Sequence, residues 1–391
     1  MAARICLLAI VFTLTASVAR AQGRSANEVL SFLLETQSLA TGDFVKDQQA
    51  ARATHDTLVR ALVVELSNVP LTTSSGGFNY RFNPSLGTLE RVTHGFGPFF
   101  VDRATTAGKG QASVSATYRF SQYTTLDTHD LRDGSFVTSS TRFRDEANPY
   151  DVETLKLDIK TSTVTLFANY GITDAIDIGV AVPIVQLRLS GERVNRYRGT
   201  PLVQARGRGD YLGIADVPIR AKVRLGRASG WNLASNLELR LPTGDPDILN
   251  GSGRYAFTGA FVASAGEGSV ESHINAGAAV GGASTQFTAS AAVAATIRQR
   301  LTLSVESLVR RIERLRGIRE VAEPHPTVIG VDTIRLVPTG DPVTTVAAVA
   351  GIRWNITQSW LLNSYVVMPV TRGGLLARPI PAMSVDYSFE P

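Results

Sequence analysis

Apolar and polar residues alternate along most of the chain from about residue 111 to the carboxy terminus, in segments separated by Gly, Asp, Asn and Pro. Along 231–241, for example, Leu237 and Leu239 lie on the face opposite Glu238. Successive side chains of a β-strand point to opposite faces of the sheet, so a period of two predicts amphipathic strands. The same period recurs at 217–225, 287–298 and 346–354.

The connections between these segments predict a closed barrel, because short and long ones alternate. Short turns are expected near 171–174, 226–230, 266–269, 299–300 and 356–359, and longer connections at 125–154, 191–210, 242–253, 313–342 and 371–378, with a short exception near 282–285. About twelve strands result, and an even number brings both barrel ends to one side, as in bacterial outer-membrane barrels. Ten or fourteen strands are the alternatives. The expected strands lie near 111–124, 155–171, 176–190, 211–225, 231–241, 254–265, 270–281, 287–298, 301–312, 343–355, 360–370 and 379–389.

The predicted class is therefore all-β, a transmembrane antiparallel barrel over 111–391, with short turns in the periplasm and long loops outside. A strand of about ten residues spans about 33 Å, and a tilt of about 40° reduces this to the ~25 Å apolar band of such barrels. No run of eighteen apolar residues follows the amino-terminal segment, so no membrane-spanning helix is expected. The expected location is the bacterial outer membrane.

Residues 1–21 have the features of a secretory signal peptide. Arg4 supplies the charged region, 5–16 an apolar core, and Ala19-Arg20-Ala21 a small-x-small cleavage site ending at Ala21. Cys6, the only cysteine, falls inside this segment. The mature chain is thus expected to hold neither a disulfide nor a reactive thiol.

Two further amino-terminal segments precede the barrel. Residues 22–70 are predicted to be helical, beginning with a capping box at 25–28, and to form a periplasmic extension. A plug that enters the barrel and a partner-docking arm are the alternatives. Residues 71–110, rich in aromatic and turn residues, are expected to form a short hairpin and a connector at the barrel mouth.

The last strand carries a candidate assembly signal. Residues 381–389 alternate and end on Tyr387 and Phe389, the pattern expected of a terminal strand read by the barrel-assembly machinery, although Glu390 and Pro391 follow. The edge strand of a soluble sheet is the alternative.

The charged residues on the polar strand faces are expected to point into the lumen, because a charge facing lipid at the midplane costs about 2–4 kcal/mol. Two interpretations stay open: the charges pair and close the lumen, or they line a pore or binding cavity. The candidates are Arg220, Lys222, Arg224, Glu238, Arg240, Glu271, His273, Glu306, Arg310, Arg353 and Asp386.

Short motifs resemble a known family of outer-membrane barrels, named for transport in the MetA pathway of phenol degradation. The stretches are GITDAIDIGVAVP at 171–183, GIADV at 213–217 leading into KVRL at 222–225, and LPTGD at 241–245. Their order and spacing agree over roughly 155–389, and 76–110 is similar to an extension on some members. The resemblance implies a barrel that exports or takes up small, often aromatic or apolar compounds, and it does not imply a catalytic role.

An enzyme is the rival class. His273, beside Ser264 or Ser290 on neighbouring strands, suggests a lipid-modifying hydrolase, but no G-x-S-x-G, H-E-x-x-H or P-loop motif is present. The chain holds 39 Lys and Arg against 34 Asp and Glu without a basic cluster, so nucleic acid is not an expected partner.

The predicted function is a channel or transporter for small, possibly hydrophobic or aromatic solutes, without a cofactor, a metal or catalysis. A structural or adhesive barrel and a lipid hydrolase are the alternatives. The expected partners are outer-membrane lipid and lipopolysaccharide, the barrel-assembly machinery and a small-molecule solute.

Overall fold

The computed structural model describes residues 24–35, 42–67, 80–83, 88–91, 95–298, 300–357 and 359–389. The side chains of 80–91 and of Glu267 are not described. The expected signal peptide, with its cleavage site at Ala21, lies outside the described residues.

Twelve antiparallel strands close into a barrel, which confirms the predicted fold class and strand number. The first strand pairs with both the second and the last, and the ladder is continuous between them. The strands are β3 (Ala112–Leu126), β6 (Asp151–Thr173), β7 (Ile176–Tyr197), β9 (Val217–Ala228), β10 (Trp231–Leu241), β11 (Ala256–Glu267), β12 (Val270–Gly281), β13 (Gln286–Arg298), β14 (Leu301–Pro324), β15 (Val331–Asn355), β16 (Trp360–Pro369) and β18 (Ile380–Ser388).

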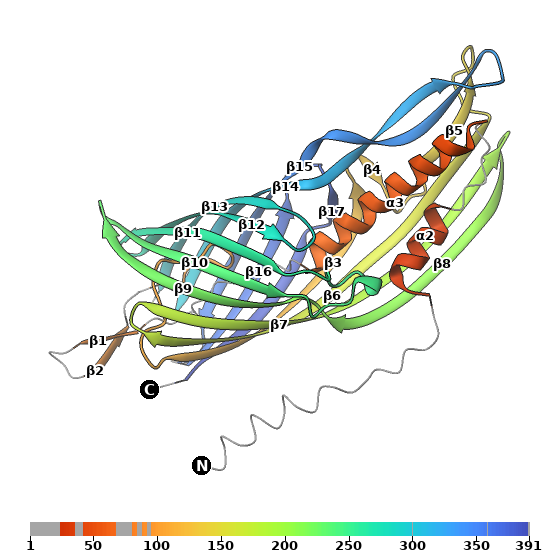
Figure 1. Ribbon diagram of the computed structural model, residues 1–391. Helices are drawn as coiled ribbons and strands as arrows, with labels where there is room; N and C mark the ends of the chain where they lie inside the picture. The colour runs from red at the N-terminus through yellow and green to blue at the C-terminus, as the bar shows by residue number, and fades with distance from the viewer. Residues whose placement is uncertain are drawn as a thin grey trace.

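The two ends of the barrel differ in construction (Figure 1). Short turns join the strands at one end, where the carboxy terminus and a two-stranded hairpin of β1 (Tyr80–Asn83) and β2 (Thr88–Arg91) also lie. At the other end β6, β7, β14 and β15 continue well past their neighbours. The parts of these four strands that lie beyond their neighbours form what we call the extension. It also contains β4 (His129–Asp130), β5 (Phe136–Phe143), β8 (Thr200–Ile214) and β17 (Leu375–Ala377).

Several segments that were expected to be loops are strands of the extension. Residues 125–154, 191–210 and 313–342 contain paired strands: β5 bridges β6 and β15, β8 pairs with β7, and β14 stays paired with β15 as far as Pro324. These segments were expected to be loops because about ten residues already cross the bilayer and because Gly and Pro interrupt 191–210 and 313–342. The strand expected at 211–225 is interrupted at Asp216, whose carboxylate accepts hydrogen bonds from the backbone N–H groups of Gly244 and Ser252.

Two helices, α2 (Ala26–Leu34) and α3 (Phe44–Ser67), lie against the inner wall of the extension, contacting β7, β8, β14 and β15 (Figure 1). The Ser25–Glu28 capping box begins α2. The helices thus lie at the opposite end from the one expected for a periplasmic extension. The reason is that their apolar faces need apolar cover, which the inner wall provides and the polar lumen does not. Among the described residues, no helix is long and apolar enough to cross a membrane.

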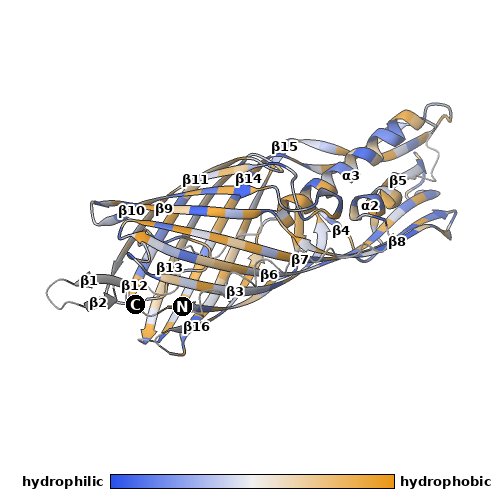
Figure 2. Cartoon of the chain, turned by 60° about the horizontal axis from the view of Figure 1, so that its bottom comes forward, coloured by the Kyte–Doolittle hydropathy of each residue, from blue (hydrophilic) through white to orange (hydrophobic). Residues whose placement is uncertain are grey.

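Apolar and polar residues alternate along the barrel strands (Figure 2), and many large apolar side chains of these strands are exposed. Large apolar side chains such as Phe261 and Val305 are 59% and 63% exposed, whereas polar groups such as Lys222 and Glu306 are buried inside. Trp360, Tyr387 and Phe389 form an aromatic group near the short-turn end. A closed barrel with an apolar exterior and an outward aromatic cluster near one end is suited to a bilayer. The protein is a bacterial outer-membrane β-barrel.

Candidate functional site: an occupied lumen

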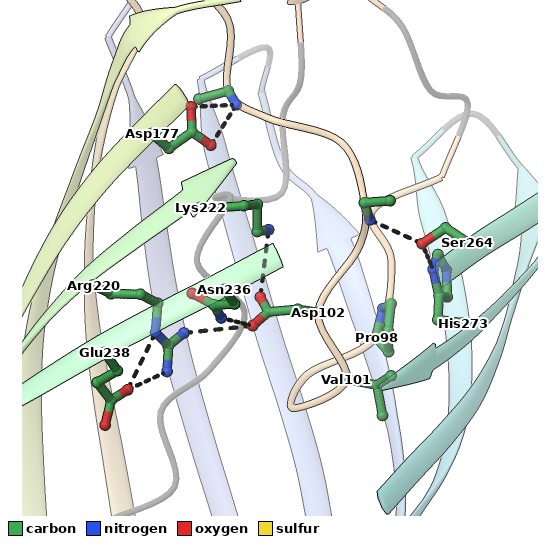
Figure 3. A network of polar contacts seen from close by, with 12 residues as sticks. Pro98, Val101, Asp102, Asp177, Arg220, Lys222, Asn236, Glu238, Ser264 and His273 are labelled. Atoms are coloured by element: carbon green, nitrogen blue, oxygen red, sulfur yellow. Dashed lines mark hydrogen bonds and ion pairs between the residues drawn. The ribbon is translucent and has the colours of Figure 1, made fainter. Parts of the chain in front are cut away.

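Residues 95–107, which we call the lumen loop, enter the barrel between β2 and β3 and run among the inward-facing side chains (Figure 3). The loop contains neither helix nor strand, so its backbone groups need partners from the wall. A tight turn at Gly97 has φ +66°, a conformation that favours glycine, and a Cβ atom there would collide with Arg103. The loop is therefore shaped to fit this interior.

Asp102 of the lumen loop joins three strand residues in one buried network (Figure 3). Its Oδ2 accepts a hydrogen bond of 2.6 Å from Asn236 Nδ2 and lies 3.7 Å from Arg220 Nη1, and its Oδ1 lies 3.5 Å from Lys222 Nζ. Glu238 completes the network, accepting from Arg220 at 3.0 Å and from Arg240 at 2.7 Å. Buried charges persist only when paired, and this network pairs them through the loop.

Glu306 on β14 holds the first half of the loop. Its carboxylate accepts hydrogen bonds from three consecutive backbone N–H groups, those of Phe99, Phe100 and Val101, the latter two at 2.9 and 3.0 Å. Arg353 donates to the carbonyl of Pro98 at 2.5 Å. The irregular backbone thus gains from strand side chains the hydrogen bonds that a ladder would otherwise supply.

Aromatic and charged groups complete the packing of this half. The Phe99 ring lies 4.6 Å from the Tyr365 ring, and the Arg353 guanidinium lies 4.7 Å from the centre of the Phe99 ring. Arg353 is also 3.7 Å from Asp386, which accepts a hydrogen bond from Asn363. The loop is bound by packing as well as by polar contacts.

The second half of the loop is anchored towards the short-turn mouth. The Ala107 N–H donates to both carboxylate oxygens of Asp177, at 3.1 and 2.9 Å. On either side of Ala107, the Thr106 hydroxyl donates to the backbone carbonyl of Asp174 and the Lys109 N–H donates to the Asp174 carboxylate, in the turn between β6 and β7. The chain then enters β3 and begins the barrel wall.

Ser264 and His273, the pair that suggested a hydrolase, lie beside Glu271 and face the lumen loop. Ser264 Oγ lies 2.9 Å from His273 Nδ1 and accepts a hydrogen bond of 2.9 Å from the Ala104 N–H. Glu271 is 3.6 Å from His273 Nε2. Ser264 and His273 are buried, so the hydroxyl meets neither lipid nor solvent. The cluster is built to hold the loop.

The helices are anchored at the other end of the interior. Arg240 donates to the Ser67 carbonyl at 2.6 Å, and Arg310 pairs with Glu65. Arg335 on β15 pairs with Asp47 at 2.6 Å. These contacts fix both ends of α3.

Helix α2 is held by a buried arginine of the extension. Arg193 on β7 donates to the Leu33 carbonyl at 3.2 Å and lies 3.6 Å from Glu153. Burial lowers the pKa of Arg193, an effect that the Glu153 carboxylate opposes. The carbonyl at the end of α2, which no helical N–H satisfies, thereby gains a charged donor.

Eight of the eleven expected lumen residues are buried inside the barrel, two are partly buried and one is exposed. Glu271 and Arg310 are partly buried, and Arg224 is exposed close to the short turn after β9. Whether they line an open pore stays a prediction. The eight buried residues are Arg220, Lys222, Glu238, Arg240, His273, Glu306, Arg353 and Asp386.

Sequence reasoning missed the partners of these residues in the amino-terminal segments. Asp102 and Arg103 are adjacent charges in an aromatic, glycine-rich stretch without alternation, and that contrast was the only local signal. Asp47 and Glu65 lie on helical faces where charges usually meet solvent. Their pairing depends on strands far along the chain.

Comparisons with known proteins give the barrel architecture only. No family model and no curated protein matches this sequence. The structure is similar to an outer membrane channel from Pseudomonas putida F1, with 12% identity, a TM-score of 0.48, and 73% of this chain and 98% of that one covered. For the KdgM porin these values are 7%, 0.35, 70% and 99%. For the transport unit of the autotransporter AIDA-I from Escherichia coli they are 11%, 0.37, 72% and 91%. Similarities this distant carry no activity, substrate or partner over to this chain.

Proposed function

We propose that the protein is an outer-membrane channel for small apolar or aromatic molecules, closed at rest by the lumen loop and by helices α2 and α3. The observation that carries the proposal is that the interior is filled by segments that precede the first barrel strand. As far as residues 24–107 are described, they form no ladder hydrogen bonds with the wall. They can therefore leave the lumen without any strand pairing being broken.

The inner wall of the extension supplies the affinity for apolar solutes. Leu155, Leu157 and Leu189 on β6 and β7 are buried, as are Ile318 and Leu336 on β14 and β15, and all belong to the same apolar cluster as residues of α2 and α3. Burying one apolar group of side-chain size contributes about 1.5–3 kcal/mol. An aromatic solute that replaced part of the helical cover would recover that energy. The motif resemblance to barrels of the MetA pathway agrees with this substrate class.

The lumen beyond the extension is polar, and its charges now pair with the lumen loop. The loop's backbone N–H groups donate hydrogen bonds to Glu306, Asp177 and Ser264. When the loop withdraws, these acceptors face the pathway together with Arg220 and Lys222. A solute with one hydroxyl group, such as a phenol, has both an apolar body for the extension and a donor for these acceptors.

A reversible lock on α2 tests the proposal. Val29 Cγ1 lies 3.0 Å from the position of a Cβ atom built on Gly207 of β8, which suits a disulfide. In planar bilayers, the oxidised Val29→Cys/Gly207→Cys protein is expected to show no channel openings. Reductant should restore them, and an added phenol should then reduce the current by occupying the extension.

A second lock tests the lumen loop separately. A Cβ atom at Gly95 would lie 2.8 Å from Thr296 Oγ1 of β13, so Gly95→Cys/Thr296→Cys should also form a disulfide and silence the channel when oxidised. The single cysteine variants are the matched controls, since the chain has no cysteine other than Cys6. If locked and unlocked proteins conduct equally, or neither conducts, the channel proposal fails and a structural barrel is favoured.

A further inference from the structure

A regular array of charged side chains covers the outer face of the extension on β6, β7 and β8. The ladder registers align three rows of three residues, each row crossing the three strands. We call this set the charged array. Its rows are Lys156, Glu192 and Arg206, then Asp158, Ser190 and Arg208, then Lys160, Arg188 and Asp210.

The centre of the charged array is hollow, because its middle residue, Ser190, has only a small side chain between the longer charged ones. A depression of about 510 Å³ lies there, with Lys156 and Arg208 on its walls. A second depression of about 480 Å³ adjoins it, shares Asp158 and Arg208 with it, and reaches Lys160 and Arg188. The five cations and three acids of the array line the two depressions together, so positive charge is in excess there.

The array holds five cations and three acids, and its pairing leaves two cations available. Arg206 pairs with Glu192 at 3.2 Å, Arg188 with Asp210 at 3.4 Å and Lys160 with Asp158 at 2.6 Å. Lys156 and Arg208 have no acidic partner within 4.0 Å among the residues that the structure describes. Both are exposed and line the same recess.

The array lies directly beyond the apolar exterior of the barrel. The row next to Arg188 and Asp210, two residues closer to the barrel, contains Gln186 and the exposed Leu212. At about 3.3 Å per residue, it lies roughly 7 Å from the array. The next row consists of Val164, Ile184 and Ile214, all apolar. This is the level at which lipid head groups meet the barrel, on the side that the loop lengths assign to the outer leaflet.

We propose that the charged array binds the phosphate groups of a phosphorylated glycolipid of the outer leaflet, namely lipid A. Lys156 and Arg208 contact the phosphates, and the acyl chains lie along the apolar rows below. Arginine and lysine form strong charge-assisted hydrogen bonds with phosphate. The site is independent of any passage through the lumen.

Native mass spectrometry of the purified full barrel with diphosphorylated lipid A tests the site. The wild-type protein is expected to retain one lipid A molecule. Lys156→Glu/Arg208→Glu should weaken retention by about tenfold or more, because two charge-assisted contacts become repulsive. Arg227→Glu/Arg298→Glu makes the same change of charge near the short-turn end and should leave retention unchanged.

Three further measurements distinguish the sources of the phosphate and the leaflet. Dephosphorylated lipid A should be retained poorly, and inorganic phosphate should not displace lipid A. If inorganic phosphate displaced lipid A, the array would be a site for free anions and the lipid proposal would be wrong. Equal retention by both double variants, or a preference for phosphatidylglycerol over lipid A, would overturn the proposal. Heat-modifiable mobility on gels verifies that each variant is folded.

Discussion

Asp102 connects the lumen loop to the barrel wall through three side chains, those of Asn236, Arg220 and Lys222. The Lys222 side chain is wholly buried, so it depends on nearby carboxylates for compensation. An acid from an irregular segment thus compensates the buried cationic side chains of the strands. At this scale the described lumen charges are paired, and whether the pairing closes the lumen stays a prediction.

Replacing Asp102 with alanine should release the lumen loop while the strand ladder stays intact. Removing one partner from a buried charge pair costs about 3–5 kcal/mol, because the other charge is left uncompensated. A thiol reagent should therefore label a cysteine at Ala104 about a hundredfold faster or more in the Asp102→Ala background. Asp247→Ala, which changes an exposed acid on a loop, is the control. Unchanged labelling would show that the loop is held without Asp102.

The last strand matters as an element because it closes the barrel. β18 pairs with β16 on one side and with β3 on the other, so its loss would expose two edges. Its outward aromatic side chains pack on one another and on the neighbouring strand: Tyr387 lies 5.0 Å from Phe389 and 4.8 Å from Trp360, between ring centres. The terminal pattern expected from the sequence thus lies at the closing seam.

Phe389→Ala should slow insertion by the barrel-assembly machinery and lower the folded fraction. The expected cause is the loss of the terminal aromatic from the closing strand, and heat-modifiable mobility on gels measures the folded fraction. Phe287→Ala removes an outward aromatic of similar exposure from β13 and serves as the matched control. An equal effect of the two substitutions would mean that Phe389 contributes ordinary lipid contact and no terminal signal.

For the whole molecule, the position of the helices depends on which end faces outward. The long hairpins of the extension enclose α2 and α3, whereas β1 and β2 lie at the short-turn end (Figure 1). The segments before the barrel therefore contribute structure at both ends. If the long hairpins face outward, as in known barrels, the helices lie on the cell surface side.

Impermeant thiol labelling on intact cells should establish this orientation. A cysteine at Ile329, fully exposed at the tip of the β14–β15 hairpin, is expected to react. A cysteine at Thr357, exposed in the turn before β16, should react only after the outer membrane is permeabilised. Labelling at Thr357 and not at Ile329 on intact cells would mean that the barrel is inserted in the opposite orientation, with the charged array at the inner leaflet.

The sequence by itself determined the barrel and its strand number. Strand alternation and turn chemistry are local, so the period of two and the alternating loop lengths could be recognised without tertiary information. The burial of Lys222 and Glu306 followed from the same parity, because only one face of each strand can meet lipid. The extension was missed because a strand of about ten residues already crosses the bilayer, and the Gly and Pro residues of 191–210 and 313–342 are typical of loops.

Only the tertiary structure decided what fills the interior. The lumen loop has no period, and its decisive hydrogen bonds join an irregular backbone to side chains far along the chain, as between Ala104 and Ser264. The helices could have packed against any apolar surface, and the inner wall that covers them exists only once β6, β7, β14 and β15 have assembled. A local pattern records which face of an element is apolar. It does not record which distant surface that face will meet.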